Sequence, residues 1–362
     1  MNRSPGFVIM AGGTGGHIFP ALAVADVLRS KGHAVTWIGT RHGLEARLVP
    51  AAGYPMEWID VGGLRGKGIG TWLKAPFVLG RAISQSMAIL RRLKPAAALG
   101  MGGFASGPGG VAARLSGCPL VLHEQNAVPG LTNRVLSRLT KNVLEGFPGA
   151  FGASRHAEHV GNPVRTAIAA LPAPEQRLAK RKGPTHLLVI GGSQGAHSLN
   201  ENLPAAVAEL PKRRRPEVLH QTGAKELDKV TARYAELGVE AKVTAFIDDM
   251  AGAYAWADLV VCRSGALTVA ELAAAGLGAV LVPFAAAVDD HQTKNAAFLV
   301  DEGAARLIPQ KDATPAALAA QLEELLGDRT LLLEMAKHAR AAARVDAAER
   351  VAARCLAAGG LS

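Results

Sequence analysis

The chain has 362 residues, of which 49% are hydrophobic and 4% aromatic, and this predicts two ordinary domains with cores of Ala, Val, Leu and Ile. Its formal charge of +10 favours an anionic partner such as nucleic acid, a phosphorylated ligand or an anionic membrane. The three cysteines are widely spaced, which argues against a disulfide framework. The sequence has no uncharged apolar run of about 18 residues, which argues against a membrane span, and no signal-peptide pattern. We therefore expect a cytoplasmic protein.

Short apolar runs alternate with helical segments along the whole chain. In the first half the runs are FVIMA, AVTWIG, PAAALG and PLVLHE, and in the second half they are HLLVIG, EVLHQT, KVTAFI, DLVVC and AVLVP. This alternation predicts βαβ units and parallel sheets. We therefore predict an α/β fold of two Rossmann-like domains facing each other across a cleft, with ligands at the carboxyl ends of the strands.

The boundary between the halves is predicted at the turn Gly161-Asn162-Pro163, because Asn-Pro disfavours a continued helix. The N-terminal domain then covers residues 1–163 and the C-terminal domain residues 164–340. A strongly helical tail from about Thr330 to Leu356 follows, and we predict that its last helix, about 341–362, completes the N-terminal domain.

Three glycine-rich loops follow predicted strands: AGGTGGH, GMGGFASGPGG and IGGSQGAHSLN. A strand that turns through glycines into a helix presents free N–H groups at the positive end of the helix dipole, which favours phosphate. Each loop alone is equally compatible with a tight turn that binds nothing. The chain lacks a G-x-x-x-x-G-K-[ST] motif, and its G-x-G-x-x-A match at residues 100–105, with Glu124 further on, is a weak sign of a dinucleotide site.

The stretch CRSGALTVAELAAAGLGAVLVPF, residues 262–284, is more specific. It predicts a strand, a helix that opens at Ala266, Leu267 and Thr268, and a second strand after Gly276. Glu271 on this helix has two interpretations. Its carboxylate can accept hydrogen bonds from a ribose diol, or it can be the capping-box partner of Thr268 in a T-x-x-E pattern.

Seven motifs together resemble the MurG family: GGTGGHIFPALAVA, GMGGFASGPGG, HEQNAVPGLTNR, GNPVR, GGSQGAHSLN, CRSGALTVAEL and DDHQTKNA. They run from Gly12 to Asn295. The resemblance implies the GT-B fold and an inverting, metal-independent glycosyltransferase without a cofactor. It would transfer N-acetylglucosamine from UDP-GlcNAc to undecaprenyl-diphosphate-linked muramoyl-pentapeptide, converting lipid I to lipid II in peptidoglycan synthesis, with roles in cell wall biogenesis, cell shape, division and the cell cycle. Phe104 departs from the pattern, where a tyrosine is expected.

The resemblance also implies the site residues. Glu271 would hold the uridine ribose, Ile247 the uracil, Gln292 the sugar and Ser193 a phosphate. The diphosphate would lie at the start of the helix formed by Ala266, Leu267, Thr268, Val269 and Ala270. Thr14, Gly15, Gly16, Asn126 and Arg165 would contact the donor from the other side.

His17 and Glu124 are the candidate acid/base residues. Inversion requires a group that removes the proton of the attacking C4 hydroxyl, and a neutral imidazole at a helix N-terminus is suited to this. His17 could instead position phosphate, and Glu124 could instead orient His17 or Asn126. We expect the neighbouring His123 to be buried structure. No D-x-D motif occurs, which agrees with a metal-free site where a helix N-terminus stabilises the leaving diphosphate.

Residues 63–95 are predicted to meet the membrane that carries the acceptor. Leu79, Ile83, Met87 and Leu90 recur at helical spacing and are expected to face the core. The apolar residues Ile69, Trp72, Leu73 and Phe77 fall among the basic residues Lys67, Lys74 and Arg81. This mixture is typical of an interfacial helix on anionic lipid, although an ordinary amphipathic helix has the same pattern. We expect a peripheral enzyme on the cytoplasmic face of the bacterial inner membrane, where the family's partners are elongation and division proteins.

Two other functions remain compatible with parts of the sequence. A nicotinamide-dependent oxidoreductase would use the G-x-G-x-x-A loop and Glu124, and a non-catalytic protein would bind a nucleotide sugar without turnover. Nucleic-acid binding is not expected, because the basic cluster at residues 211–217 has no accompanying aromatic groove or zinc spacing.

Overall fold

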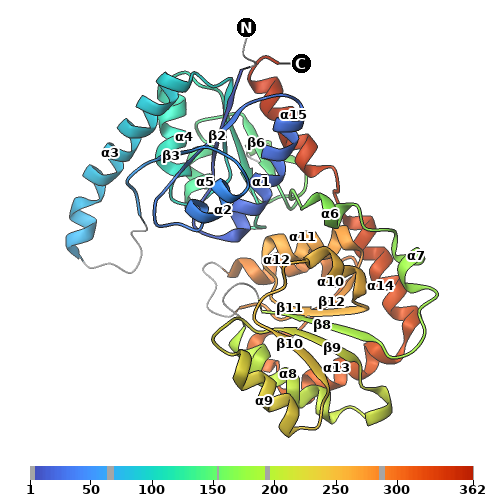
Figure 1. Cartoon of the computed structure of the whole chain (residues 1–362). Helices are drawn as coiled ribbons and strands as arrows, with labels where there is room; N and C mark the ends of the chain where they lie inside the picture. Colours follow the sequence, from blue (N-terminus) through green and yellow to red (C-terminus); the bar gives the residue numbers. More distant parts are fainter. Residues whose placement is uncertain (1–4, 63–68, 153–154, 192–195, 285–289, 362) are drawn as a thin grey trace. The chain divides into compact units, whose positions relative to one another are not determined.

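The computed structural model describes residues 5–62, 69–152, 155–191, 196–284 and 290–361, with the backbone alone for residues 69–74. The chain forms two compact units, one comprising Met1–Arg165 with Arg344–Ser362 and the other Thr166–Ala343. Each unit is built around one parallel sheet with helices on it (Figure 1). The predicted α/β class with two Rossmann-like domains is therefore confirmed. Within the described ranges, no helix is both long and apolar enough to cross a membrane.

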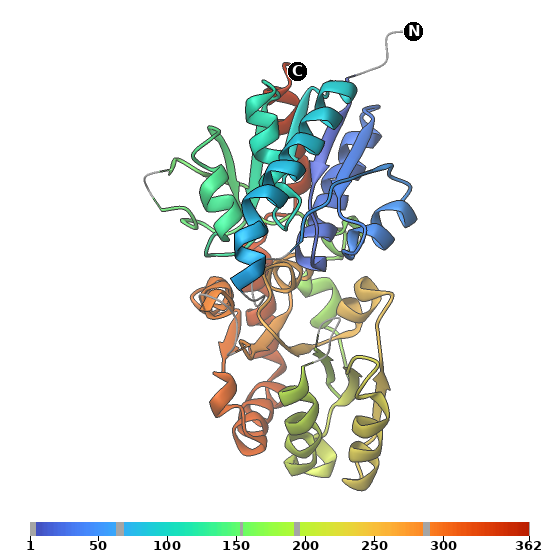
Figure 2. The ribbon, with the colours of Figure 1, turned by 90° about the vertical axis from the view of Figure 1, so that its left-hand side faces the viewer.

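The first unit has a seven-stranded sheet in the order β3-β2-β1-β4-β5-β6-β7. Its strands are β1 (Phe7–Met10), β2 (Val35–Gly39), β3 (Met56–Trp58), β4 (Ala97–Gly100), β5 (Leu120–Glu124), β6 (Asn142–Glu145) and β7 (Glu158–His159). Its helices are α1 (Gly15–Ser30), α2 (Glu45–Ala51), α3 (Ile69–Leu93), α4 (Ser106–Leu115), α5 (Leu131–Leu136) and α15 (Ala347–Ala358). Successive strand residues point to opposite faces, so Phe7 and Ile9 join the core with α1 and α15, whereas Val8 and Met10 join the core with α3 and α4 (Figures 1 and 2).

The second unit has a six-stranded sheet in the order β10-β9-β8-β11-β12-β13. Its strands are β8 (His186–Ile190), β9 (Glu217–Gln221), β10 (Ala241–Thr244), β11 (Leu259–Cys262), β12 (Gly278–Leu281) and β13 (Ala305–Leu307). Its helices are α6 (Thr166–Ala169), α7 (Pro174–Leu178), α8 (His197–Glu209), α9 (Leu227–Glu236), α10 (Met250–Trp256), α11 (Ala266–Ala275), α12 (His291–Val300), α13 (Pro315–Gly327) and α14 (Arg329–Ala342), with short 3-10 turns η2 (Lys212–Arg214) and η4 (Gln310–Asp312). The main core lies between the sheet and helices α8, α9 and α13.

Both sheets reverse their strand order beside the first strand, and this places the glycine loops. In the first unit β1 lies between β2 and β4, and the loops that follow β1 and β4 are the first two glycine loops. In the second unit β8 lies between β9 and β11, and β11 leads into α11. Such a switch point leaves an open crevice at the carboxyl ends of the strands, where α/β proteins bind ligands.

Three sequence expectations need correction. Strands β3, β6, β7 and β13 were not predicted, because they have only two to four residues and carry little periodic signal. The helical tail is two helices, since the chain leaves α14 after Ala342 and returns to the first unit, where α15 packs on α1. Leu79 is exposed on α3, whereas Leu90 is buried and Ile83 and Met87 are half-buried, so the core-facing stripe begins further along the helix than predicted.

Candidate active site

The first two glycine loops lie directly against each other at the switch point of the first unit. Gly102 and Gly103 have φ angles of +99° and +82°, a region that side chains disfavour. A Cβ on Gly103 would lie 2.2 Å from the carbonyl oxygen of Gly12, and a Cβ on Gly102 would lie 2.9 Å from Cε1 of His17. These glycines therefore serve close packing between the two loops and the imidazole, a role that the sequence did not reveal.

Glu45 holds the first glycine loop in place, a role that no sequence motif indicated. Its side chain is 1% exposed. Oε2 accepts a hydrogen bond from the Gly13 N–H at 3.0 Å, while Oε1 accepts from the N–H and the hydroxyl of Thr40 at 3.1 and 2.7 Å. The start of α2 is thus tied to the loop that leads into α1.

His17 lies in the first turn of α1, as predicted, and is half-buried. Its Nδ1 is 2.8 Å from Oε1 of Gln125, the residue just after β5. His123 is fully buried on β5, and burial lowers its pKa to about 4, so it is a neutral structural histidine as expected. Gln125 was not among the predicted site residues.

Glu124 is 2% exposed and its carboxylate is occupied by four hydrogen bonds. Oε1 accepts from the backbone and side-chain N–H groups of Asn126 at 2.9 and 3.2 Å. Oε2 accepts from the Gly130 N–H at 3.1 Å and from the Asn133 amide at 2.9 Å. This geometry makes Glu124 an organiser of the loop between β5 and α5, and His17 hydrogen-bonds to the amide oxygen of Gln125 instead.

In the second unit, α11 begins directly after Gly265, so the N–H groups of Ala266, Leu267 and Thr268 form its first turn. Thr268 is inside the helix and Gly265 is the N-cap, so the capping-box interpretation of Glu271 is wrong. Glu271 is 4% exposed, and its Oε2 accepts a hydrogen bond from the hydroxyl of Tyr254 on α10 at 3.1 Å. Gly276 ends the helix with a φ of +61°, as a C-terminal glycine should.

The structure places the other predicted donor-binding residues as follows. Thr14 is the N-cap of α1, directly before Gly15 and Gly16, and the guanidinium of Arg165 lies over the ring of Phe19 on the same helix. Oε1 of Gln292 accepts a hydrogen bond from the Phe284 N–H at 2.9 Å. Val269 is buried and Ala270 half-buried on α11. Ser193 lies outside the described residues.

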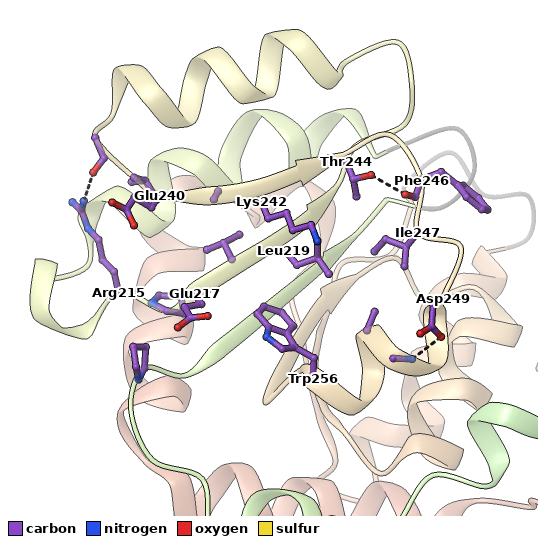
Figure 3. Close-up of a pocket in the computed structure, with 18 of the residues that line it drawn as sticks. Arg215, Glu217, Leu219, Glu240, Lys242, Thr244, Phe246, Ile247, Asp249 and Trp256 are labelled. Atoms are coloured by element: carbon purple, nitrogen blue, oxygen red, sulfur yellow. Dashed lines mark hydrogen bonds between the residues drawn. The ribbon is translucent and has the colours of Figure 1, made fainter.

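Ile247 lies in the loop between β10 and α10. It lines a cavity of about 1130 Å³ that runs along β9 and β10, together with Leu219, Lys242 and Trp256 (Figure 3). Glu271 and the first turn of α11 do not line this cavity. At the Ile247 end, Asp249 caps α10 by accepting a hydrogen bond from the Gly252 N–H at 2.9 Å. The cavity therefore extends from Ile247 along β9 and β10.

The predicted membrane segment is only partly described. Lys67 lies outside the described residues, and the side chains of Ile69, Trp72, Leu73 and Lys74 on α3 are also outside them. Phe77 is 82% exposed, and Val78 and Leu79 are exposed beside it. Arg81 is exposed and pairs with Asp60 at 3.0 Å. An apolar surface next to a basic side chain is therefore present on the described part of α3.

Comparison with known proteins agrees with this architecture. The chain matches the glycosyltransferase family 28 N-terminal domain over residues 7–145 and the C-terminal domain over residues 186–351. It is 58% identical over 349 residues to the UDP-N-acetylglucosamine--N-acetylmuramyl-(pentapeptide) pyrophosphoryl-undecaprenol N-acetylglucosamine transferase of Nitrosococcus oceani, covering 96% of this chain and 97% of that one. The protein of that name from Halorhodospira halophila is 56% identical, with 96% of each chain covered.

Among solved structures, MurG of Acinetobacter baumannii is 43% identical with a TM-score of 0.85, covering 97% of this chain and 99% of that one. A UDP-GlcNAc 2-epimerase from Neisseria meningitidis shares the fold alone, with 11% identity, a TM-score of 0.68, and 97% and 100% coverage. The chain belongs to the MurG family of glycosyltransferases, within glycosyltransferase family 28.

Proposed function

We propose that the chain transfers N-acetylglucosamine from UDP-GlcNAc to the C4 hydroxyl of undecaprenyl-diphosphate-linked N-acetylmuramoyl-pentapeptide, converting lipid I to lipid II. The observation that carries this function is the identity of 58% to a transferase of that name over 96% of the chain. Neither the oxidoreductase nor the non-catalytic binding protein has support of this kind. The G-x-G-x-x-A loop is explained by the packing of Gly102 and Gly103 on the first glycine loop.

His17 is the proposed general base. In an inverting displacement, the C4 oxygen of the acceptor bonds to the anomeric carbon, the bond from that carbon to the diphosphate breaks, and the proton of the hydroxyl passes to the base. His17 stands at the switch point with one ring nitrogen hydrogen-bonded to Gln125. Glu124 is the weaker choice because four donors already occupy its carboxylate.

The donor nucleotide is proposed to bind the second unit at α11. The N–H groups at the start of α11 would stabilise the diphosphate, and the carboxylate of Glu271, fixed by Tyr254, would accept hydrogen bonds from the ribose. The contacts of Ser193, Ile247 and Gln292 with phosphate, uracil and sugar stay predictions, as do those of Thr14, Gly15, Gly16, Asn126 and Arg165 with the donor.

We propose that the reaction needs no metal ion. The chain has no D-x-D motif, and the N-terminus of α11 offers several N–H groups that can stabilise negative charge on the leaving UDP without a cation. The expected result is that transfer continues in excess EDTA.

We propose that α3 docks the enzyme on the cytoplasmic face of the bacterial inner membrane. The exposed side chains of Phe77, Val78 and Leu79, with Arg81 beside them, favour insertion into the interface of an anionic bilayer. Co-sedimentation with vesicles tests this proposal. Binding should require anionic lipid and weaken in a Phe77→Glu/Leu79→Glu variant, and binding that ignores both changes would refute it. Contacts with elongation and division proteins stay a prediction from the family.

One experiment tests the activity. Labelled UDP-GlcNAc or UDP-GalNAc is incubated with a lipid I analogue in the presence of EDTA. Transfer from UDP-GlcNAc alone is expected, and His17→Ala should lose about 100-fold or more in turnover while its affinity for UDP-GlcNAc stays near that of the wild type. Absence of transfer would refute the function, loss of transfer in EDTA would refute the metal-free step, and near-normal turnover of His17→Ala would refute the base.

A further inference from the structure

We infer that Gln125 is a positioning residue that fixes the tautomer of His17, with the proton on Nδ1 and the lone pair on Nε2. The catalytic consequence rests on the proposed function, because it matters only if His17 is the base. The tautomer itself follows from a chain of buried hydrogen bonds that begins at the backbone of Gly161 and ends at His17. Each contact in this chain leaves only one arrangement of donors and acceptors.

The chain of contacts begins at His123. Its Nε2 is 2.8 Å from the carbonyl oxygen of Gly161, which can only accept, so the proton of this imidazole is on Nε2. The ring is fully buried and neutral, so its Nδ1 has a lone pair and must accept. Gly161 has a φ of +86°, and a Cβ there would lie 2.3 Å from Cβ of Arg344, so its backbone is closely packed.

The orientation of the Gln125 amide follows from His123. Nε2 of Gln125 is 3.0 Å from Nδ1 of His123 and 3.1 Å from the His123 carbonyl oxygen, two acceptors that match its two protons. The reversed orientation would place the amide oxygen against both acceptors. The backbone is also held, because the Asn162 amide donates to the Gln125 carbonyl oxygen at 2.9 Å. Gln125 is 1% exposed, so water does not compensate for a wrong orientation.

His17 is the last member of the chain. The amide oxygen of Gln125 can only accept, and it is 2.8 Å from Nδ1 of His17, so that nitrogen must carry the proton. Nε2 then has the lone pair, and no described residue forms a hydrogen bond to it. Gly102 packs against the same ring, which limits its rotation. A base needs this arrangement, since a proton on the wrong nitrogen would prevent it from accepting the hydroxyl proton.

The alternation of side chains at the end of β5 explains why a glutamine has this role. His123 and Gln125 point to one side of the strand and Glu124 to the other, where it contacts Asn126, Gly130 and Asn133. A neutral amide accepts the N–H of His17 without placing a buried negative charge beside the proposed base.

Nitrogen NMR of the full chain labelled with 15N-histidine tests the inference. The spectrum is recorded at about pH 8, where an ordinary imidazole is neutral, and the His17 signals are assigned among the eleven histidines by their loss in His17→Gln. The wild type should show His17 protonated on Nδ1. Protonation on Nε2 would overturn the inference without the need for any variant at Gln125.

Gln125→Leu and Gln125→Glu then test the glutamine. Gln125→Leu removes the acceptor, so His17 should shift toward protonation on Nε2 and kcat should fall about 10- to 100-fold, with the KM for UDP-GlcNAc within about twofold of the wild type. Gln125→Glu keeps an acceptor for His17 and should keep the wild-type tautomer, although it loses the donors to His123. An unchanged tautomer in Gln125→Leu would overturn the role of Gln125.

The two proposals fail in distinguishable ways. If His17→Ala keeps near-normal turnover while the His17 tautomer responds to Gln125→Leu, the base is wrong and the positioning role of Gln125 stands. If the His17 tautomer ignores Gln125 while His17→Ala is inactive, the base stands and the positioning role is refuted.

Discussion

Glu45→Gln is expected to loosen the first glycine loop while it leaves the fold of the first unit intact. The two carboxylate oxygens of Glu45 have different partners, because Oε1 accepts twice from Thr40 and Oε2 accepts from the Gly13 N–H. A glutamine would keep its oxygen on the Thr40 side, where two donors are buried. Its NH₂ group would then face the N–H of Gly13, and two donors cannot bond to each other.

The loss of stability depends on how far water can replace the lost hydrogen bond. A hydrogen bond to a charged acceptor contributes about 1.5–3 kcal/mol, but Gly13 is exposed and its N–H can turn to water, so we expect a loss of about 1–2 kcal/mol in the free energy of unfolding. Turnover should fall by about 10- to 100-fold, because the loop positions His17, while UDP affinity should stay unchanged.

Urea denaturation, turnover and calorimetric UDP binding measure these three effects. Glu57→Gln is the matched control, since Glu57 lies in the same unit and forms a surface ion pair with Arg92 at 2.6 Å, which is expected to contribute less than about 1 kcal/mol. If Glu45→Gln matched the wild type in both stability and turnover, the proposed tie between α2 and the glycine loop would be refuted.

Three further results are expected. Tyr254→Phe should weaken UDP binding about two- to tenfold in calorimetry, because the carboxylate of Glu271 loses its 3.1 Å hydrogen bond, and unchanged affinity would argue against a ribose role for Glu271. Gly103→Ala should lower the free energy of unfolding by more than about 2 kcal/mol in urea denaturation, since its Cβ would lie 2.2 Å from a backbone oxygen. Gly13→Ala is the control. Its φ is also positive, at +85°, but the space around it is open, so it should lower the free energy of unfolding by about 1 kcal/mol. Burial lowers the pKa of His220 from 6.5 to about 3. Between these two pH values only the unfolded chain takes up the proton, so the free energy of unfolding is highest above pH 6.5. It should fall by about 1.4 kcal/mol per pH unit as the pH falls toward 3. Stability that stays flat between pH 7 and pH 5 would contradict this assignment.

Much of the fold could be predicted because its signals are local. Runs such as FVIM and LLVI are apolar throughout, as strands buried on both faces require, and Gly276 marks the end of α11. The short strand β3, Met56–Trp58, was missed because three half-buried residues form it only by pairing with β2. Exposure along α3 was misjudged at Leu79 because the helix pattern does not say where along the helix its packing begins.

The candidate site also combines residues that the sequence indicates with partners that only folding brings to them. His17, Glu124 and Glu271 could be selected from motifs, since His17 follows a glycine loop, Glu124 ends a predicted strand and Glu271 lies near a helix start in the sequence. Their partners could not. Gln125 contacts a residue 108 positions away, and Glu45 reaches back 32 positions to Gly13.

The sequence by itself determined the two parallel sheets, the positions of the glycine loops and the family, because hydrophobic period, turn residues and long motifs are all properties of neighbouring residues. Only the tertiary structure decided that Glu124 organises a loop and that Gln125 hydrogen-bonds to His17. The physical reason is that side chains alternate at the end of a strand, so two adjacent residues face different surroundings, and the identity of those surroundings depends on segments that folding brings from elsewhere in the chain.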